Sequence, residues 1–537
     1  MAEKNFAITP SVSISRSKFL RTSTHKTSFN LGAIVPLYVD EVLPGDTRSI
    51  DVASLIRMST PIAPIMDDIE MELFAFFVPN RIVWTNWKKF MGESPTAGYQ
   101  AWNGTYPYVA LEDNETYMTD GMEHVIGKYM GLGQSTAAGG TRVSALPLRG
   151  YLAIYNRWFR DQNVEAPATI SLGDGQDSSS VGGSSYTYGS NPLVAYKKSD
   201  YFTRALPYAQ KSAPVTLPLG TTAPVGFYAT GNVAPGSQEV TNKTGASAAG
   251  KFDTLEVFTT GGSTSNGDVV ADLRNATAAT INQLREAFQL QKLLEKDALY
   301  GTRYWELLYG HFGVRSPDAT LQDPEYLGGI KFMINIDQVL QTGVAADWSS
   351  DEYTGGLGRP GANSVTGNNG SLFTKSFVEH GHIFILGVAR QSRHTYGQGI
   401  MPMWQRFDRY DYYWPEFANL GAQEIKKKAL FLSGTSATDE ATFGYQEAWA
   451  DYRYKPSIVS GVLAPWQSNA LDFWTLADKF NSTPTLSTSF LKETRSNLSR
   501  ALSTGSTGPD FIADFYFRDT AVRPLPLYSI PGLIDHH

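Results

Sequence analysis

The clearest alternation of apolar and polar side chains lies between Met66 and Glu93. The odd positions of residues 69–77 are apolar, whereas the even positions begin with two glutamates and then become apolar. This pattern predicts a strand that runs from a solvated edge into a core. Pro79-Asn80 ends the strand. We expect a short helix to follow, with an apolar stripe made of Val83, Trp84, Trp87, Phe90 and Met91.

Extended segments with turn residues lie on both sides of this strand. Prolines exclude a long helix from residues 29–66, and Leu43-Pro44-Gly45-Asp46 predicts a turn between two strands. Alternation also predicts strands at Phe377–Val388, where His380 and His382 share one face, and from Phe511 as far as Thr520.

Helical periodicity is confined to a few segments. It predicts helices over Leu148–Asp161, from Thr280, and over Thr302–Phe312. Thr280 and Gln283 form a capping box at the start of the second helix. Three segments rich in Gly, Ser, Thr and Asn, residues 169–192, 221–279 and 341–371, are predicted as loops. We interpret residues 221–279 as an insertion that projects from the main body, and a flexible linker is the alternative.

Composition supports a chain with many turns and few charges. It has 537 residues with 49 glycines and 28 prolines, and 18% of its residues are charged, below the average of about 25%. Such a low fraction is expected when partners cover much of the surface, although a large core has the same effect. There is no cysteine, so disulfides and thiolate metal sites are excluded. We expect no signal peptide, and the apolar runs are too short to cross a bilayer.

The first thirty residues differ in charge from the rest of the chain. Residues 1–30 hold five Lys or Arg and one Glu, so their formal charge is 5 − 1 = +4, while the whole chain carries −7. Any nucleic-acid contact must therefore be local. Cations separated by Ser and Thr suit an extended basic arm that meets phosphates. A disordered, solvated tail is the alternative.

Motifs for catalysis or cofactor binding are incomplete. Gly245–Lys251 matches a phosphate-binding loop, but Phe252 stands where a Ser or Thr must hold magnesium. His380 and His382 share a strand face without a third metal ligand at recognisable spacing, which favours a structural or interface role. The acids of residues 67–72 are interpreted as a solvated strand edge, not a catalytic pair. A basic cluster either contacts phosphate or forms salt bridges with Asp408 and Asp411. It consists of Arg390, Arg393 and His394, with Arg406 and Arg409 beyond. We therefore predict no catalytic, cofactor-binding or metal-binding residue.

Several short motifs carry a family resemblance, and they occur in order along the chain. They are His25-Lys26-Thr27, Val42-Leu43-Pro44-Gly45-Asp46, Phe76-Phe77-Val78-Pro79-Asn80-Arg81 with Trp84 and Trp87, Asp200-Tyr201-Phe202-Thr203, Ala205-Leu206-Pro207, Gln283-Leu284-Arg285, Gly301-Thr302-Arg303-Tyr304, His311-Phe312-Gly313-Val314, Pro324-Glu325-Tyr326-Leu327-Gly328-Gly329, Val522-Arg523-Pro524-Leu525-Pro526 and Tyr528-Ser529-Ile530-Pro531-Gly532-Leu533-Ile534-Asp535-His536. Together they resemble the major capsid proteins of the Microviridae, single-stranded-DNA bacteriophages, and in particular their gokushovirus branch.

The resemblance implies a mainly β fold, an eight-stranded antiparallel jelly roll (the viral capsid β-barrel) with long loop insertions and a few helices. Residues 1–30 would be a basic N-terminal arm and residues 31–537 a single jelly-roll domain. Within that domain, residues 221–279 match the insertion that protrudes at the three-fold axes of gokushoviruses and is thought to meet the host. Residues 280–313 would be a helical segment.

The implied function is self-assembly of sixty copies into a small icosahedral shell around circular single-stranded DNA, without enzymatic activity or a cofactor. The expected partners are further copies, the genome, internal scaffolding, DNA-pilot and small DNA-binding phage proteins, and a bacterial surface receptor, with no membrane insertion. The protein would lie in the virion after assembly in the bacterial cytoplasm. The expected nucleic-acid contacts are Arg16, Lys18, Arg21, His25 and Lys26. The expected subunit-interface or packing residues are Arg81, Trp84, Trp87, Arg523 and Tyr528.

A second class of protein is left open by the residues. Abundant Tyr and Trp with an acidic isoelectric point are also typical of β-rich carbohydrate-binding or carbohydrate-active proteins. The lack of a convincing carboxylate pair counts against this alternative.

Overall fold

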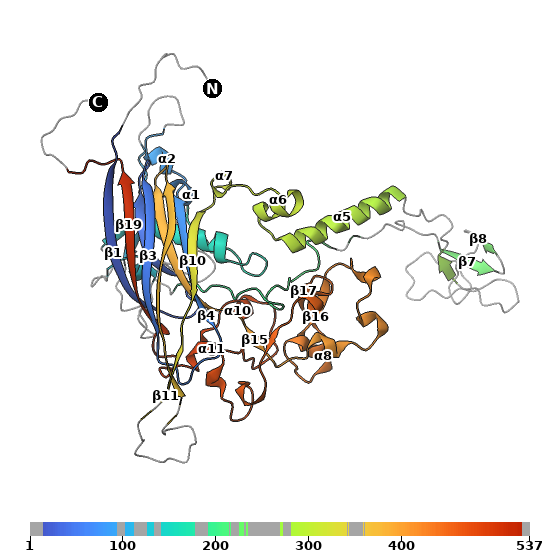
Figure 1. Cartoon of the computed structure of the whole chain (residues 1–537). Coiled ribbons are helices and arrows are strands. Elements are labelled where there is room, and N and C mark those ends of the chain that lie inside the picture. Colours follow the sequence, from blue (N-terminus) through green and yellow to red (C-terminus); the bar gives the residue numbers. More distant parts are fainter. Residues whose placement is uncertain are drawn as a thin grey trace, which may run out of the picture. The chain divides into compact units, whose positions relative to one another are not determined.

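A computed structural model of the chain (Figure 1) describes residues 14–93, 102–111, 126–133, 141–177, 192–213, 215, 225–229, 232–234, 269–271, 281–340, 342, 358 and 360–528. The chain divides into two compact units. One contains Met1–Ala209 with Gly301–His537, and the other contains Gln210–Tyr300.

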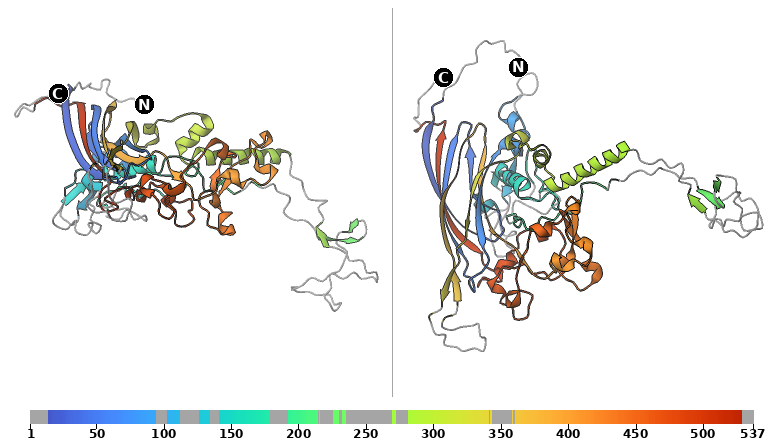
Figure 2. Two further views of the ribbon diagram at one scale, coloured as in Figure 1. Left: turned by 60° about the horizontal axis from the view of Figure 1, so that its bottom comes forward. Right: turned by 45° about the vertical axis from the view of Figure 1, so that its right-hand side comes forward.

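The first large sheet joins the two ends of the described chain. Its strands are β1 (Ser17–Phe29), β3 (Thr47–Met58), β13 (Val365–Ser376) and β19 (Phe511–Arg523), in the antiparallel order β1-β19-β3-β13. The C-terminal strand β19 therefore lies between two N-terminal strands, as Figures 1 and 2 show in red between blue. Buried and exposed positions alternate along β3 and β19, because one face of the sheet packs on the core.

The second large sheet contains the strand predicted from the clearest alternation. Its strands are β2 (Val35–Val42), β4 (Ile69–Pro79), β10 (Glu325–Met333) and β14 (Gly381–Gln391), in the antiparallel order β10-β4-β14-β2. The strand β4 is thus central, and the prediction that it starts at a solvated edge is wrong. The predicted strand Phe377–Val388 also begins too early, since residues 377–380 form the turn before β14.

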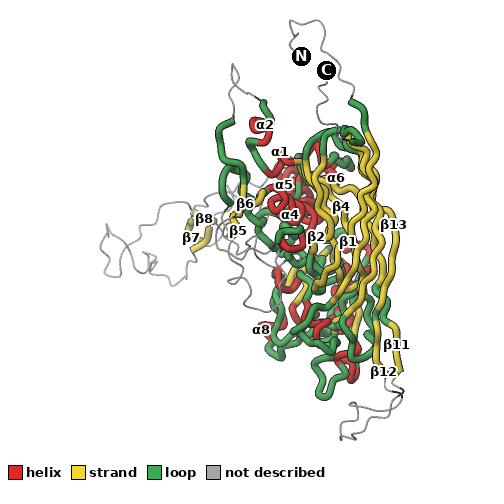
Figure 3. The backbone as a smooth tube through the Cα atoms, turned by 90° about the vertical axis from the view of Figure 1, so that its left-hand side faces the viewer, coloured by secondary structure: helices red, strands yellow, loops and turns green. Residues whose placement is uncertain are grey.

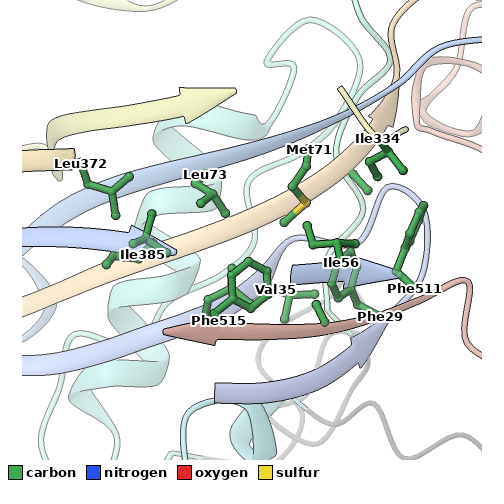
Figure 4. Close-up of a cluster of buried hydrophobic side chains, with 14 of the residues drawn as sticks. Phe29, Val35, Ile56, Met71, Leu73, Ile334, Leu372, Ile385, Phe511 and Phe515 are labelled. Atoms are coloured by element: carbon green, nitrogen blue, oxygen red, sulfur yellow. The ribbon is translucent and has the colours of Figure 1, made fainter. Parts of the chain in front are cut away.

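The two sheets pack face to face around the main hydrophobic core. Buried side chains of the first sheet, such as Phe29, Ile56 and Phe515, meet those of the second, such as Met71 and Ile385 (Figure 4). No hydrogen-bonded ladder joins the described strands of one sheet to those of the other, so they form two sheets and not a closed barrel. The predicted class, mainly β with antiparallel sheets and few helices, is confirmed.

Two glycines of β10 allow close backbone approaches, one to the opposite sheet and one to the neighbouring strand of the same sheet. A Cβ atom on Gly328 would lie 2.3 Å from the backbone oxygen of Leu372 in β13. A Cβ on the next residue, Gly329, would lie 2.5 Å from the backbone oxygen of Leu73 in β4. Both obstacles are backbone atoms that no rotamer change moves, so these positions require glycine.

A second core covers the outer face of the second sheet. Helix α4 (Leu146–Ile154) continues into a π-helical turn (Tyr155–Phe159) and packs against outward-facing residues of β4 and β14 (Figure 3). Gly150 faces the ring of Phe384, where a Cβ would be 2.7 Å from the nearest carbon. The Tyr151 hydroxyl donates a hydrogen bond to the carbonyl of Ile34 (2.9 Å). This helix and turn match the helix predicted over Leu148–Asp161.

The segment after β4 forms two short helices where one was predicted. They are α1 (Asn80–Val83) and α2 (Trp87–Phe90). Trp84 lies between them with extended backbone angles (φ −148°, ψ 115°). Its side chain is fully buried, and its extended backbone interrupts the predicted helix.

Other short elements connect these layers. In the first unit they are β5 (Tyr108–Leu111), α3 (Ile126–Tyr129), β6 (Thr141–Ser144), α6 (Tyr304–Phe312), α7 (Asp318–Leu321), β11 (Asp337–Leu340), β12 (Pro360–Asn363), β15 (Thr395–Tyr396), β16 (Gln423–Lys426), α8 (Ser436–Asp439), β17 (Thr442–Gln446), α9 (Ala450–Arg453), β18 (Ser457–Ile458), α10 (Thr488–Leu491) and α11 (Arg495–Ser499). Short 3-10 helices occupy Pro402–Gln405, Arg409–Asp411, Pro415–Phe417, Lys427–Ala429, Gly461–Leu463 and Asp472–Trp474.

The second unit contains a long helix and a small sheet. The helix is α5 (Ile281–Tyr300), and the sheet has the order β8 (Asn232–Ala234), β7 (Val225–Ala229) and β9 (Val269–Ala271). Helices α5 and α6 occur where the sequence predicts them. The capping residue Thr280 and the phosphate-loop match at 245–252 lie outside the described residues.

A buried network of charges holds the C-terminal part of the first unit together. Lys197 Nζ lies 2.9 Å from Asp478 Oδ2, and His394 Nδ1 lies 3.2 Å from the same oxygen. The amide of Asn497 donates to Asp478 Oδ1 (2.5 Å), and His394 Nε2 lies 3.3 Å from Glu493 Oε2. Burial alone would lower the pKa of His394, but the hydrogen bond with Asp478 and the attraction of the Glu493 carboxylate outweigh it and raise the pKa to about 9.

This network predicts a pH-dependent stability. The pKa of His394 is raised above its unfolded value of about 6.5, so its contribution is complete below that pH and is lost as the pH rises through about 9. In urea unfolding of the unassembled chain, His394→Gln should therefore cost more at pH 6.5 than at pH 9.5, by about 3 kcal/mol. An equal loss at both pH values would contradict the ionic role of this histidine.

Candidate nucleic-acid interface and packing residues

The predicted basic arm is, from Ser17 to Phe29, the edge strand β1 of the first sheet. Alternation along the strand separates the predicted nucleic-acid contacts onto two faces. Lys18 and Lys26 are exposed on the outer face, while Arg21 and His25 point toward β2. Arg16 precedes the strand and is exposed. Residues 1–13 lie outside the described residues.

The inward-pointing residues of β1 already have partners within the chain. The His25 Nδ1 atom donates to the carbonyl oxygen of Leu37 in β2 (2.7 Å). Arg21 Nη1 lies 2.5 Å from Asp40 Oδ2 and 3.5 Å from Asp519 Oδ2. The hydrogen bond with Asp40 raises the pKa of Arg21. The charge of Arg21 is therefore used to join β1 to β2.

Arg48 lies at the centre of the same network and is completely buried, as is Asp519. Its Nε donates to Asp519 Oδ1 (2.9 Å), and its Nη2 lies 2.6 Å from Asp40 Oδ2 and donates to the Tyr38 hydroxyl (3.0 Å). Burial would raise the pKa of Asp40, but Arg21 and Arg48 outweigh it and lower this pKa. The network joins β1, β2, β3 and β19, so it ties the two sheets together.

The acids at the start of β4 are paired and not solvated. Glu72 is 8% exposed and accepts a hydrogen bond from Arg390 Nε (2.8 Å), while Lys198 Nζ lies 3.2 Å from it. Glu70 forms an ion pair with Lys198 and a hydrogen bond with the Ser392 hydroxyl (3.0 Å). The prediction of a solvated edge is therefore wrong for these two glutamates. Arg390 forms a salt bridge, but with Glu72 and not with the predicted Asp408 or Asp411.

The histidines on the predicted strand face separate in the structure. His382 lies in β14, where burial lowers its pKa to about 4. His380 lies in the preceding turn, and its ring is 5.8 Å from that of Trp87. No group of three or more potential metal ligands occurs among the described residues. No helix in the same part of the chain is long and apolar enough to span a membrane.

The predicted packing residues divide into buried and exposed ones. Trp84 is fully buried, and its indole Nε1 donates to Asp174 Oδ1 (2.6 Å). Four aromatic rings surround it with centroids 5.1–6.0 Å away, those of Trp87, Phe90, Trp102 and Tyr106. Trp87 is only half-buried.

The three further predicted residues lie in α1, at the end of β19 and beyond that strand. Arg81 forms an ion pair with Glu379 (2.6 Å) and also bonds to Gln322. Arg523 Nε lies 3.0 Å from the buried Asp46. Tyr528 is 77% exposed.

The outer face of the first sheet carries cations that the sequence analysis missed. We define the outer face as Lys18, Lys26, Arg57, Arg518 and the aromatic Tyr516, all exposed. Arg57 and Arg518 come from β3 and β19, and their places in the alternation of these strands are the signal that could have identified them. Two acids, Asp51 and Asp514, share this face, and Lys26 Nζ lies 3.6 Å from Asp514 with its side chain 74% exposed. Four cations and two acids leave a positive surplus.

The described residues form a sandwich of two four-stranded sheets, and the buried charges between the sheets are paired within the chain. The chain belongs to the family of capsid proteins (F proteins), which matches residues 7–533. It is 37% identical to capsid protein VP1 of Bdellovibrio phage phiMH2K, over 99% of this chain and 98% of the relative. It is 36% identical to capsid protein VP1 of Chlamydia phage 1, over 99% and 98% of the two chains, and 36% identical to that of Spiroplasma virus 4, over 95% and 94%.

These comparisons confirm the resemblance to the capsid proteins of the Microviridae. The chain is a major capsid protein, a structural component of the virion and not an enzyme, and its copies assemble into a shell. Nothing in the comparisons supports the carbohydrate-binding alternative.

The contrast between Trp84 and Trp87 gives a test of their packing roles. Trp84→Ala should lower the free energy of unfolding by about 3–5 kcal/mol, because it removes a large buried ring. Trp87→Ala should cost clearly less, because that side chain is half-buried. Urea unfolding of the unassembled chain measures both. If Trp84→Ala left stability unchanged and blocked only shell formation, Trp84 would be an interface residue instead.

Proposed function

We propose that this capsid protein folds as a jelly roll and builds a small icosahedral shell of sixty copies around circular single-stranded DNA. The strand order is the observation that supports a jelly roll. Numbered along the chain, the eight long strands pair as 1-8-3-6 in one sheet and 2-7-4-5 in the other. Two four-stranded antiparallel sheets with these crossed connections fit the two Greek keys of a viral jelly roll.

We further propose that the outer face of the first sheet is a contact with the genome. Its surplus of cations attracts phosphates without sequence preference, and Tyr516, which is 43% exposed, can stack an unpaired base. Arg16, which precedes β1 and is exposed, adds one more cation to the proposed contact. We leave Arg21 and His25 out of this proposed contact, because both side chains bond within the chain.

The remaining partners are proposed because the chain belongs to this family of capsid proteins. Internal scaffolding, DNA-pilot and small DNA-binding phage proteins are proposed partners during assembly in the bacterial cytoplasm. Residues 221–279 are the proposed three-fold protrusion for the host receptor, and of these the structure describes only the short strands β7, β8 and β9.

The shell geometry can be tested on particles purified from infected cells. Cryo-electron microscopy should give icosahedral symmetry with sixty copies of this chain, each with two facing four-stranded sheets. Their nucleic acid, once released, should be cut by a nuclease specific for single strands. Helical particles, another copy number or double-stranded contents would contradict the proposal.

The genome contact predicts a charge effect without a stability effect. Replacing Lys18, Lys26, Arg57 and Arg518 with Gln should reduce packaged DNA and make its retention less resistant to salt, because each lost cation removes about one phosphate contact. The unfolding free energy of the unassembled chain should change little, as these side chains are exposed.

The exposed residues Lys88 and Lys89, changed to Gln, provide a control elsewhere in the chain for the double variant Lys18→Gln with Lys26→Gln, because both remove two exposed lysines. Unchanged DNA content and salt resistance in the fourfold variant would contradict a genome contact at this face. The variant Arg21→Gln tests the other face of β1. This change should lower the free energy of unfolding, because it breaks a partly buried ion pair.

A further inference from the structure

The segment Pro402–Trp414 exposes many large side chains, and we call it the aromatic ridge. Its backbone is part of the orange stretch of the chain in Figure 2. Its exposed members are Met403 (59%), Trp404 (67%), Phe407 (88%), Tyr410 (63%), Tyr412 (53%), Tyr413 (46%) and Trp414 (39%). Single exposed apolar residues are common on protein surfaces, whereas a contiguous group of this size marks an interaction site.

The aromatic ridge is held in place by its own hydrogen bonds. The backbone amides of Phe407 and Asp408 both donate to Asp411 Oδ2, each at 2.8 Å. The indole Nε1 of Trp414 donates to the carbonyl oxygen of Arg409 (3.1 Å). A surface that is already ordered before binding loses less conformational entropy when a partner covers it.

Charge distinguishes between a protein and a nucleic acid as the partner. The ridge contains two arginines and two aspartates, so its formal charge is zero. Arg406 is already paired with Asp451 and lies 4.4 Å from the ring centroid of Tyr452, and Arg409 lies 5.0 Å from that of Trp414. A protein surface that binds nucleic acid needs surplus cations to replace the counterions around the phosphates. The aromatic ridge has no surplus of cations.

The composition of the ridge fits the centre of a protein–protein interface. Trp, Tyr, Phe, Met and Arg are enriched in such centres, and lysine, which is depleted there, does not occur between residues 402 and 414. A cleft of about 270 Å³ beside the ridge is lined by Asp411, Glu424 and Lys426 among others. Its polar lining suits the rim around an apolar contact.

We propose that the aromatic ridge is a contact between two copies of this chain in the shell. The family assembles from copies of itself, so another copy is the protein partner present in every particle. The contact would bury aromatic area that remains in water in the single chain, and each repetition around a closed axis adds the same stabilisation.

Variants of the two most exposed rings of the ridge test this contact. Phe407→Ser and Trp404→Ser, each produced in infected cells, should lower the yield of sedimenting particles at least about tenfold, the effect of losing roughly 1.4 kcal/mol per contact. Val378→Ser is the matched control, since Val378 is also 88% exposed but lies in the turn before β14. It should leave the yield unchanged. The unfolding midpoint of the unassembled chain should be the same for all three.

A normal particle yield with Phe407→Ser and Trp404→Ser would overturn the proposal. So would normal shells that lack DNA, or normal shells that fail to attach to the host, because these point to another partner.

A crosslinking measurement does not depend on the folding of these variants. With Tyr410 replaced by the photo-crosslinking amino acid p-benzoylphenylalanine, illuminated particles should yield a covalent pair of two 59.0 kDa chains. Crosslinks to DNA, or none between chains, would overturn the contact.

Discussion

The position of β19 between β1 and β3 is the constraint on which the rest of the structure depends. Strand β19 pairs with both neighbours along its whole length, so that Phe511 lies opposite Phe29 on one side and Met58 on the other. The first sheet therefore cannot form until nearly the whole chain is available. Pairings between such distant segments have a high loop-closure cost, which the burial of the inward-facing phenylalanines of β19 offsets.

The same strand completes the buried charge network. Asp519 is fully buried in β19 and binds Arg48 from β3, while Asp40 from the opposite sheet binds Arg48 and Arg21. Such ions stabilise the fold only as a complete set, because an unpaired charge in this position would be strongly destabilising. Many charges of this chain are thus used internally. This leaves an outer face with surplus cations and a ridge with a neutral, aromatic surface, and the different chemistry of these surfaces is the basis for proposing two kinds of partner.

Local sequence patterns predicted individual elements well where one physical rule decided them. The alternation over residues 69–78 matches β4, and helical spacing matches α4, α5 and α6. Patterns failed where the deciding contact came from elsewhere in the chain. Glu72 looks like a solvated acid until Arg390 and Lys198 are placed beside it. The alternation also predicted a strand at residues 377–380, but these residues form a turn, in which Val378 is 88% exposed.

The sequence by itself determined the class of the protein. A mainly β organisation with long insertions follows from alternation, glycine and proline, and the ordered motifs identify the capsid family, because these signals are local in the chain. Only the tertiary structure decided how the charges are used. Lys18 and Arg21 are equivalent cations in the sequence, yet strand alternation and the approach of Asp40 expose the first and bind the second. The functional meaning of a charge depends on its partners across the fold, and those partners lie far away along the chain.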